Sequence, residues 1–347
     1  MTGASPRIEV GLLLGSQFPA GESAATRFAQ QLGQVAVARD AGFDSVWASQ
    51  HYLADPFQYL HPLPVLARLL AEAGTMRIGT SVLLLGLANP VDLAEELATL
   101  DILSDGRLTV GVGLGYRDVE FDAFGVPPDR RLRRFLDNLD VLRRLWAGEE
   151  VSFESEHVRL DRVRSALLPV QRPHPPIWMA GHTDAAIRRA ARRGLPWLAA
   201  AAHVEDDYLR HQVSVYRAAC RDSGRDDLEL PLLQEIHVAP TETEALDVVR
   251  RSLALKYQVY EQWGQDKILP PDQSFDVEFE RLRRSRFIIG DPEQCRRRIR
   301  WLMDTVRPTH LLLRMQWPGM TEDEVMSSLR LFAEKVLPVL GATAGKG

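Results

Sequence analysis

The chain has 347 residues, with 42 Lys and Arg against 47 Asp and Glu and a formal net charge of −5 at pH 7. This length holds one large α/β domain or two smaller ones, and the balanced charge offers no polycationic surface for nucleic acid. No apolar run is long enough to span a membrane, and no secretory signal pattern opens the chain. Cys220 and Cys295 are isolated, without the spacing of a metal site or a disulfide framework. We therefore expect a soluble, cytoplasmic protein without a metal site and without nucleic acid or membrane as a partner.

Strand-like and helix-like patterns alternate through the first half of the chain. The apolar runs that predict strands are residues 8–14, 43–48, 78–85 and 108–112. Apolar residues at three- and four-residue spacing predict helices over 28–41, 62–73, 91–100 and 127–146. Glycines such as Gly42 and Gly148 stand where these helices are expected to end. The strand runs are almost wholly apolar, which is typical of a parallel sheet buried on both faces.

The second half continues the same alternation. Strands are predicted over 177–180, 197–202, 230–239 and 310–315, with helices over 181–193, 205–222 and 322–339 and further helices that begin at Glu242 and after Asp291-Pro292. Two stretches interrupt this alternation. Residues 151–175 are predicted to run over the barrel surface, with a polar, strand-like pattern over residues 151–168, and residues 258–286 are irregular. Eight strand–helix repeats favour one α/β domain over residues 1–347, a (β/α)8 TIM barrel with insertions, rather than an open doubly wound sheet.

The active sites of TIM barrels lie in the loops that follow the strands. Applied to the predicted strands, this rule selects segments that are far apart in sequence but would meet at one mouth. These are His51, residues 84–89, 113–116 and 181–183, His203, and residues 314–317.

Short motifs occur in a fixed order along nearly the whole chain. They are residues 41–47 with His51, 79–82, Asn89-Pro90, 104–108, 111–116 with Glu120-Phe121, 176–181, 287–292 and 332–338. No single motif is specific, since a pair of glycines alone is weak evidence. Their order and spacing resemble the bacterial luciferase-like flavin-dependent oxidoreductase superfamily, which includes monooxygenases.

The resemblance implies a luciferase-like TIM barrel, often a homodimer, that binds reduced FMN (FMNH2) or the deazaflavin F420 at the carboxyl ends of the strands. Two-component monooxygenases of the superfamily react FMNH2 with O2, whereas the F420-dependent enzymes transfer hydride. The resemblance also implies that the irregular segment 258–286 is a mobile lid that keeps water from the site. A plain surface insertion is the alternative.

His51 is the predicted catalytic residue. It follows the second predicted strand, where the superfamily often places a site histidine, and imidazole can hydrogen-bond a flavin and exchange a proton near neutral pH. The alternative is a histidine that only packs the barrel mouth. Relatives commonly carry an acid before this histidine, and this chain has Gln50. The substitution removes a carboxylate that could orient the ring, and it argues against F420, for which an Asp-His pair is frequent.

Two further groups are predicted to bind the cofactor. Ser81-Val82 matches the position where relatives have a non-prolyl cis peptide in a bulge behind the flavin; an ordinary trans strand is the alternative. Gly181, His182 and Thr183 open a helix, whose free N–H groups and positive dipole end suit the cofactor phosphate. Simple N-capping by Thr183 is compatible with that role. The orientation of His182, toward solvent or toward the phosphate, stays open.

The remaining predicted cofactor-binding residues are Gly113, Gly115, Tyr116 and Asn89. Small residues after the fourth strand would let a cofactor or substrate approach closely, and the alternative is a turn that requires positive φ. Asn89 could hydrogen-bond the flavin ring edge or a ribityl hydroxyl, or it could only end the loop before Pro90. The arginine that contacts the flavin near the position of Leu114 in bacterial luciferase is absent from this chain.

Taken together, these observations predict a flavin-dependent monooxygenase that uses FMNH2 and O2 to oxidise a small hydrophobic organic substrate. A separate flavin reductase is expected, because no nicotinamide-binding glycine fingerprint follows a strand. One alternative is an F420-dependent oxidoreductase that transfers hydride. The other is a non-catalytic flavin-binding protein.

Overall fold

The computed structural model describes residues 7–264 and 283–342. Eight parallel strands form a closed ring, because β1 pairs with β3 on one side and with β13 on the other, while β10 pairs with both β9 and β11. In order around the ring the strands are β1 (Glu9–Leu13), β3 (Ser45–Ala48), β5 (Arg77–Leu84), β6 (Leu108–Gly113), β9 (Ile177–Ala180), β10 (Trp197–Ala200), β11 (Pro231–Val238) and β13 (His310–Arg314). The predicted (β/α)8 barrel is confirmed, and each of the eight predicted strands is present.

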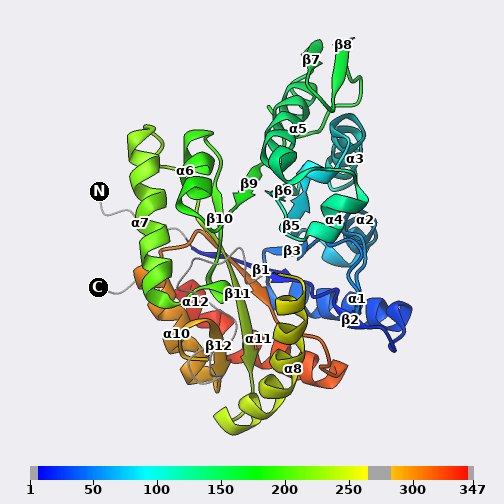
Figure 1. Cartoon of the computed structure of the whole chain (residues 1–347). Coiled ribbons are helices and arrows are strands. Elements are labelled where there is room, and N and C mark those ends of the chain that lie inside the picture. Colours follow the sequence, from blue (N-terminus) through cyan, green and yellow to red (C-terminus); the bar gives the residue numbers. More distant parts are fainter. Residues whose placement is uncertain (1–6, 265–282, 343–347) are drawn as a thin grey trace.

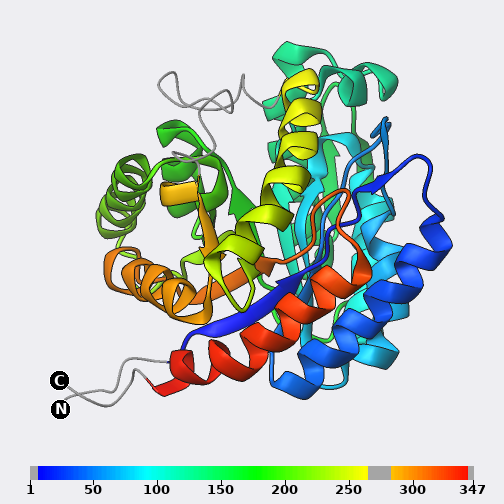
Figure 2. The same ribbon diagram turned by 90° about the horizontal axis from the view of Figure 1, so that it is seen from below.

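Helices surround the strands, as Figure 2 shows. Their apolar faces supply the buried layer between helices and barrel, including Leu66, Leu97 and Leu142. The long helices are α1 (Ala24–Ala41), α2 (Pro62–Ala73), α3 (Pro90–Leu103), α5 (Arg131–Trp146), α6 (Asp184–Arg192), α7 (Asp206–Asp222), α8 (Glu242–Gln262), α10 (Pro292–Thr305) and α11 (Glu322–Lys335), and the short ones are α4 (Asp118–Ala123) and α12 (Leu337–Ala342). Local sequence fixes where they begin and end: α1 ends at Gly42, whose φ is 86°, and Thr241 with Glu244 forms a capping box at the start of α8.

Two tryptophans fill the barrel interior beneath the mouth. The rings of Trp47 on β3 and Trp178 on β9 stack with their centroids 4.7 Å apart. Room for Trp47 comes from glycines on the neighbouring strands, since a Cβ at Gly79 would lie 2.1 Å from its ring and one at Gly11 would lie 2.6 Å from it. The barrel is therefore a packed core below the cavity described next, not a channel.

The end of β5 departs from regular strand geometry. The Ser81–Val82 peptide bond is cis, and the pairing of β5 with β6 shifts register between Thr80 and Leu83. The predicted bulge is thus confirmed. Only glycine fits on β6 beside it: a Cβ at Gly111 would lie 2.1 Å from the Thr80 carbonyl oxygen, and one at Gly113 would lie 2.6 Å from Val82 Cγ2.

The structure also contains strands outside the ring. Most notably, β12 (Phe287–Gly290) pairs in parallel with the second half of β11. In the stretch predicted to leave the barrel, β7 (Val151–Glu154) and β8 (Arg159–Val163) form an antiparallel hairpin that stands out beside α5 (Figure 1). A third pair, β2 (Phe18–Pro19) and β4 (Phe57–Gln58), is also antiparallel.

The irregular segment predicted from Gln258 begins later than expected. Helix α8 continues to Gln262, because Val259 and Tyr260 are buried and hold its last turn against the molecule. Most of the predicted lid, residues 265–282, lies outside the described residues. Among the helices that the structure describes, none is both long and apolar enough to span a bilayer.

Substitution of Gly111 by alanine is predicted to destabilise the protein by about 2 kcal/mol or more, because the new Cβ would clash with a backbone carbonyl that cannot move freely. Gly33 provides a matched control. It lies exposed within α1 with nothing within 4 Å of a built Cβ, so Gly33→Ala should stabilise the protein by about 0.5–1 kcal/mol. Chemical denaturation of the two variants measures both values, and equal effects would contradict the packing argument.

Candidate active site

A cavity of about 290 Å³ lies at the carboxyl ends of the strands. Leu84, Phe135, Met179 and Leu198 give it a largely apolar lining. Of the residues predicted from sequence to bind cofactor or catalyse, nine line this cavity: His51, Ser81, Val82, Gly113, Gly115, Tyr116, Gly181, His182 and Thr183. These residues come from the ends of four different strands, β3, β5, β6 and β9, which the barrel brings together.

Asn89 is the exception. It is exposed and does not line the cavity, and its side-chain oxygen accepts hydrogen bonds from the backbone N–H groups of Val91 and Asp92. This is the geometry of an N-cap, and it accounts for an asparagine before Pro90 at the start of α3. The structure therefore gives Asn89 the capping role that the sequence analysis held as the alternative to cofactor binding.

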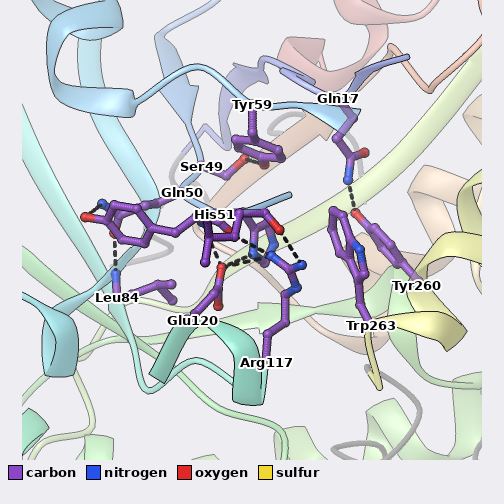
Figure 3. A network of polar contacts seen from close by, with 12 residues as sticks. Gln17, Ser49, Gln50, His51, Tyr59, Leu84, Arg117, Glu120, Tyr260 and Trp263 are labelled. Carbon is purple, nitrogen blue, oxygen red and sulfur yellow. Dashed lines mark hydrogen bonds and ion pairs between the residues drawn. The ribbon is translucent and has the colours of Figure 1, made fainter. Parts of the chain in front are cut away.

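Glu120 supplies the carboxylate that Gln50 does not (Figure 3). Its side chain comes from α4 and is fully buried. One of its oxygens, Oε1, lies 3.0 Å from Nδ1 of His51, accepts a hydrogen bond of 2.9 Å from the Tyr52 N–H, and lies 3.3 Å from Nη1 of Arg117. The expectation that His51 lacks an orienting carboxylate is therefore wrong. The partner is 69 residues away in sequence, and local reading around His51 could not find it.

Gln50 has a different task. Its side-chain carbonyl accepts a 2.7 Å hydrogen bond from the Leu84 N–H, just beyond the cis peptide, and its amide nitrogen donates to the Tyr52 hydroxyl at 2.9 Å. The same nitrogen lies 3.0 Å from Nε2 of His61. A carboxylate could not donate these bonds. Gln50 therefore ties the loop after β3 to the end of β5.

Aromatic side chains enclose His51. Its ring lies 5.2 Å from that of Tyr59, 5.8 Å from that of Tyr116 and 5.3 Å from that of Trp263. Trp263 follows α8, and the guanidinium of Arg117 lies 4.1 Å from its ring centre. In Figure 3, Arg117 thus stands between the carboxylate of Glu120 and the face of Trp263. This packing fixes the side chains around His51.

The start of α6 forms a second polar region of the cavity wall. The hydroxyl of Thr183 accepts a hydrogen bond from the Ala186 N–H, as the capping prediction requires. The first N–H groups of a helix have no partners within it, and its dipole places positive charge there. Arg189, on the same helix, also lines the cavity and forms no ion pair with the described residues. The acidic Asp184 of this turn is engaged by His211, 3.0 Å away.

His182 and His203 form a pair of neutral imidazoles in the wall. Their ring centres are 5.2 Å apart, and both line the cavity. Burial lowers the pKa of His182 to about 4 and the pKa of His203 well below its ordinary value. His182 therefore carries no charge near neutral pH and can offer an anion only a hydrogen bond. The question left open by the sequence, whether this side chain points into solvent or the site, is answered in favour of the cavity.

Glycine positions in the wall have local packing reasons. A Cβ at Gly181 would lie 2.5 Å from the Cβ of Ala186, and Gly115 has a φ of 84°. With the crowding of Gly113 by Val82, each glycine is required by the backbone or by a neighbour, whatever the cavity holds. The absence of side chains at these points nevertheless widens the cavity.

The chain belongs to the luciferase-like monooxygenase family. Residues 8–306 match that family. Its members are flavin-dependent monooxygenases and related oxidoreductases, and this chain is an enzyme of that class.

Solved structures of the same fold include enzymes that use either kind of cofactor. The monooxygenase RslO1 of Streptomyces bottropensis is 27% identical, with a TM-score of 0.85 over 96% of this chain and 99% of its own. The oxygenating constituent of 3,6-diketocamphane monooxygenase from Pseudomonas putida, in complex with FMN, is 19% identical, with a TM-score of 0.78 over 96% and 99%. An F420-dependent secondary alcohol dehydrogenase is also 19% identical, with a TM-score of 0.77 over 96% and 99%. At 19% identity these last two likenesses concern the fold alone.

Glu120→Gln is predicted to destabilise the protein by about 3 kcal/mol, because it leaves the buried guanidinium of Arg117 without a carboxylate. Asp118 in the same helix is the control. Its carboxylate is 71% exposed in a pair with Arg131, so Asp118→Asn should change stability by no more than about 0.5 kcal/mol. Thermal and urea unfolding of both variants test this, and a loss as small for Glu120→Gln as for Asp118→Asn would refute the buried-pair interpretation.

Proposed function

We propose that the protein is the oxygenase component of a two-component flavin-dependent monooxygenase, which uses FMNH2 and O2 to oxidise a small organic substrate. The observation that supports this proposal is that two features occur in the same cavity. The N-terminus of α6, with Thr183 and Arg189, lines the same cavity as a histidine held by a buried carboxylate. A separate flavin reductase is the partner that the proposal requires, and FMN in a structure of the same fold supports the choice of cofactor.

The cavity residues fit a phosphorylated flavin. The helix start at α6, the Thr183 hydroxyl and the Arg189 guanidinium would hold the phosphate. Ser81 Oγ and Tyr116 Oη are buried without a hydrogen-bond partner among the described residues. Buried hydroxyls lose free energy unless they are paired, so both would be satisfied by the polar edges of a bound cofactor. The arginine that contacts the flavin in bacterial luciferase is absent here, because Leu114 lies near its position. Arg189 would supply a positive charge to the cofactor from a different place in the cavity.

His51 is the proposed proton-exchanging residue. A carboxylate at Nδ1 keeps a proton on that nitrogen, so Nε2 is the atom that accepts or releases a proton toward a bound molecule. Reduced flavin supplies the electrons for the reduction of O2 when it is bound. The residues of this chain orient the reactants, transfer the proton at Nε2 and exclude water by their apolar lining.

F420-dependent hydride transfer is the second candidate. The absence of an acid before His51 disfavours F420, but Glu120 places a carboxylate oxygen 3.0 Å from Nδ1 of His51. Anaerobic titration with FMN, FMNH2 and F420 decides between the two. Preferential binding of FMNH2 supports the monooxygenase, and preferential binding of F420 overturns it in favour of hydride transfer.

Arg189→Met should weaken the binding of FMN about tenfold while leaving the binding of riboflavin, which lacks the phosphate, unchanged. The matched control is Arg192→Met, which removes an exposed arginine that lies on the same helix outside the cavity lining. Fluorescence titration of both flavins against the three proteins gives the answer. An equal loss of affinity for FMN and riboflavin would show that Arg189 does not contact the phosphate.

His51→Ala should lower the rate of FMNH2-dependent substrate oxidation by a factor of about 10²–10⁴, the usual contribution of a positioned acid or base. FMN affinity should change little. His157→Ala serves as the control, because this histidine lies in the turn between β7 and β8, outside the cavity lining. The measurement is the rate of product formation in a single turnover, after FMNH2-loaded protein is mixed with O2 and substrate. A variant of His51 that binds flavin and turns over normally would support the non-catalytic role of this residue.

A further inference from the structure

A cluster of buried charges adjoins the cavity on the side away from α6. Glu235 of β11 accepts from Lys256 of α8 and lies 3.2 Å from Nη1 of Arg314, at the end of β13. Its other oxygen accepts a 2.9 Å hydrogen bond from the Trp317 indole. All three charged side chains are at least nine-tenths buried, and Arg314 lines the cavity. One carboxylate is therefore shared by two cations.

Three side chains that carry hydrogen-bond donors line the cavity at this wall, and the hydroxyl of one of them, Tyr59, is paired with the Ser49 hydroxyl. Tyr59 and Tyr260 line the cavity beside Arg314, and the hydroxyl oxygen of Tyr260 accepts from the Gln17 amide at 2.6 Å and from Arg314. Nε of Arg314 is buried and has no hydrogen-bond acceptor among the described residues. A guanidinium beside phenolic hydroxyls is a donor set suited to a carboxylate, which can accept two parallel N–H bonds.

This wall is distinct from the proposed phosphate end. Around the ring, β13 is separated from β9, which leads to α6, by β10 and β11 on the shorter path and by four strands on the longer one. The one other buried carboxylate near His51, Glu120, is already paired with Arg117. The positive charge of the cluster is thus not offset by a second acidic side chain that faces the same wall among the described residues.

We propose that the Arg314 wall, formed by Arg314, Tyr59 and Tyr260, binds the carboxylate of the substrate, so that the enzyme acts on small apolar molecules that bear a carboxylate. Buried charge is costly unless it is paired, and an anionic occupant would neutralise the excess positive charge of the cluster. Tyr59 also borders His51, with ring centres 5.2 Å apart. A carboxylate at this wall therefore places the body of the substrate beside the proton-exchanging residue. The assignment of the ligand as substrate rests on the proposed function, whereas the anion site itself does not.

Benzoate and benzamide test the site directly, because they have the same shape and differ in charge. Calorimetric titration at pH 7 without flavin should show benzoate binding at least about tenfold more tightly than benzamide. Arg314→Met should abolish this preference while leaving benzamide affinity unchanged. Lys256→Met should also reduce it, because Glu235 would then neutralise Arg314. Arg192→Met is the matched control, because this exposed arginine lies outside the cavity lining, and it should keep the preference for benzoate.

Titration with pH gives a second readout that needs no variant. Burial lowers the pKa of Lys256 to about 8, so the preference for benzoate should be full below that pH and should decline as the lysine loses its proton above it. The other titratable groups that the structure describes around Lys256 keep their charge between pH 7 and 9. Glu235 has a lowered pKa, Tyr257 and Tyr260 have raised pKa values, and His203 stays neutral. Arg314 and Arg286 stay protonated.

Three outcomes overturn the proposal. They are no measurable benzoate binding, equal affinity for benzoate and benzamide in the unmodified protein, and a preference that survives Arg314→Met in a protein shown by circular dichroism to be folded. The reduced flavin is the other anion that could bind at the Arg314 wall. If Arg314→Met weakens FMNH2 binding but not benzoate binding, the positive charge serves the cofactor. Failure of FMNH2 to bind at all, with the benzoate preference intact, refutes the proposed function and leaves the anion site standing.

Discussion

Closure of the parallel sheet is the constraint on which the molecule depends. Because all eight ring strands are parallel and the β10–β11 pairing closes the sheet, every strand ends at the same rim. Residues as distant in sequence as His51, Thr183 and Arg314 therefore line one cavity. An open sheet would also gather its strand ends along one edge, but it would spread them in a line. The ring instead surrounds a small volume with side chains from all directions. It also places Arg189 and Arg314, which lie after one strand and at the end of another three positions away around the ring, in the walls of the same cavity.

The sequence predicted what depends on local pattern and on topology. Apolar runs predicted the eight ring strands, and Gly42 predicted a helix end. The rule for strand ends and the family resemblance together selected nine residues that line the cavity. The sequence did not predict β12, because Phe287–Gly290 is a four-residue run directly after an irregular, arginine-rich segment, where neither period nor length distinguishes a strand.

The charged partners of the buried side chains around the cavity could not be predicted from the sequence. Glu120 reads as an ordinary solvated acid at the start of a helix, yet it is fully buried against His51 and Arg117. Lys256 and Glu235 similarly meet across 21 residues of chain. Sequence spacing carries no sign of such pairs, since they depend on how α4 and α8 pack over the rim. Asn89 is the opposite case, because its position directly before α3 makes it the N-cap of that helix. An asparagine there is suited both to capping and to cofactor binding, and its place in the sequence favours capping.

The fit between β5 and β6 also constrains how this sequence can diverge. Val82 occupies the space that a side chain at position 113 would need, and the Thr80 carbonyl occupies the space for one at position 111. A homologue could carry a larger residue at position 113 only if position 82 had lost its branched side chain. No larger residue than glycine fits at position 111 while the bulge in β5 persists. Positions 82 and 113 should therefore change together among homologues, whereas position 111 should remain glycine wherever β5 keeps its bulge.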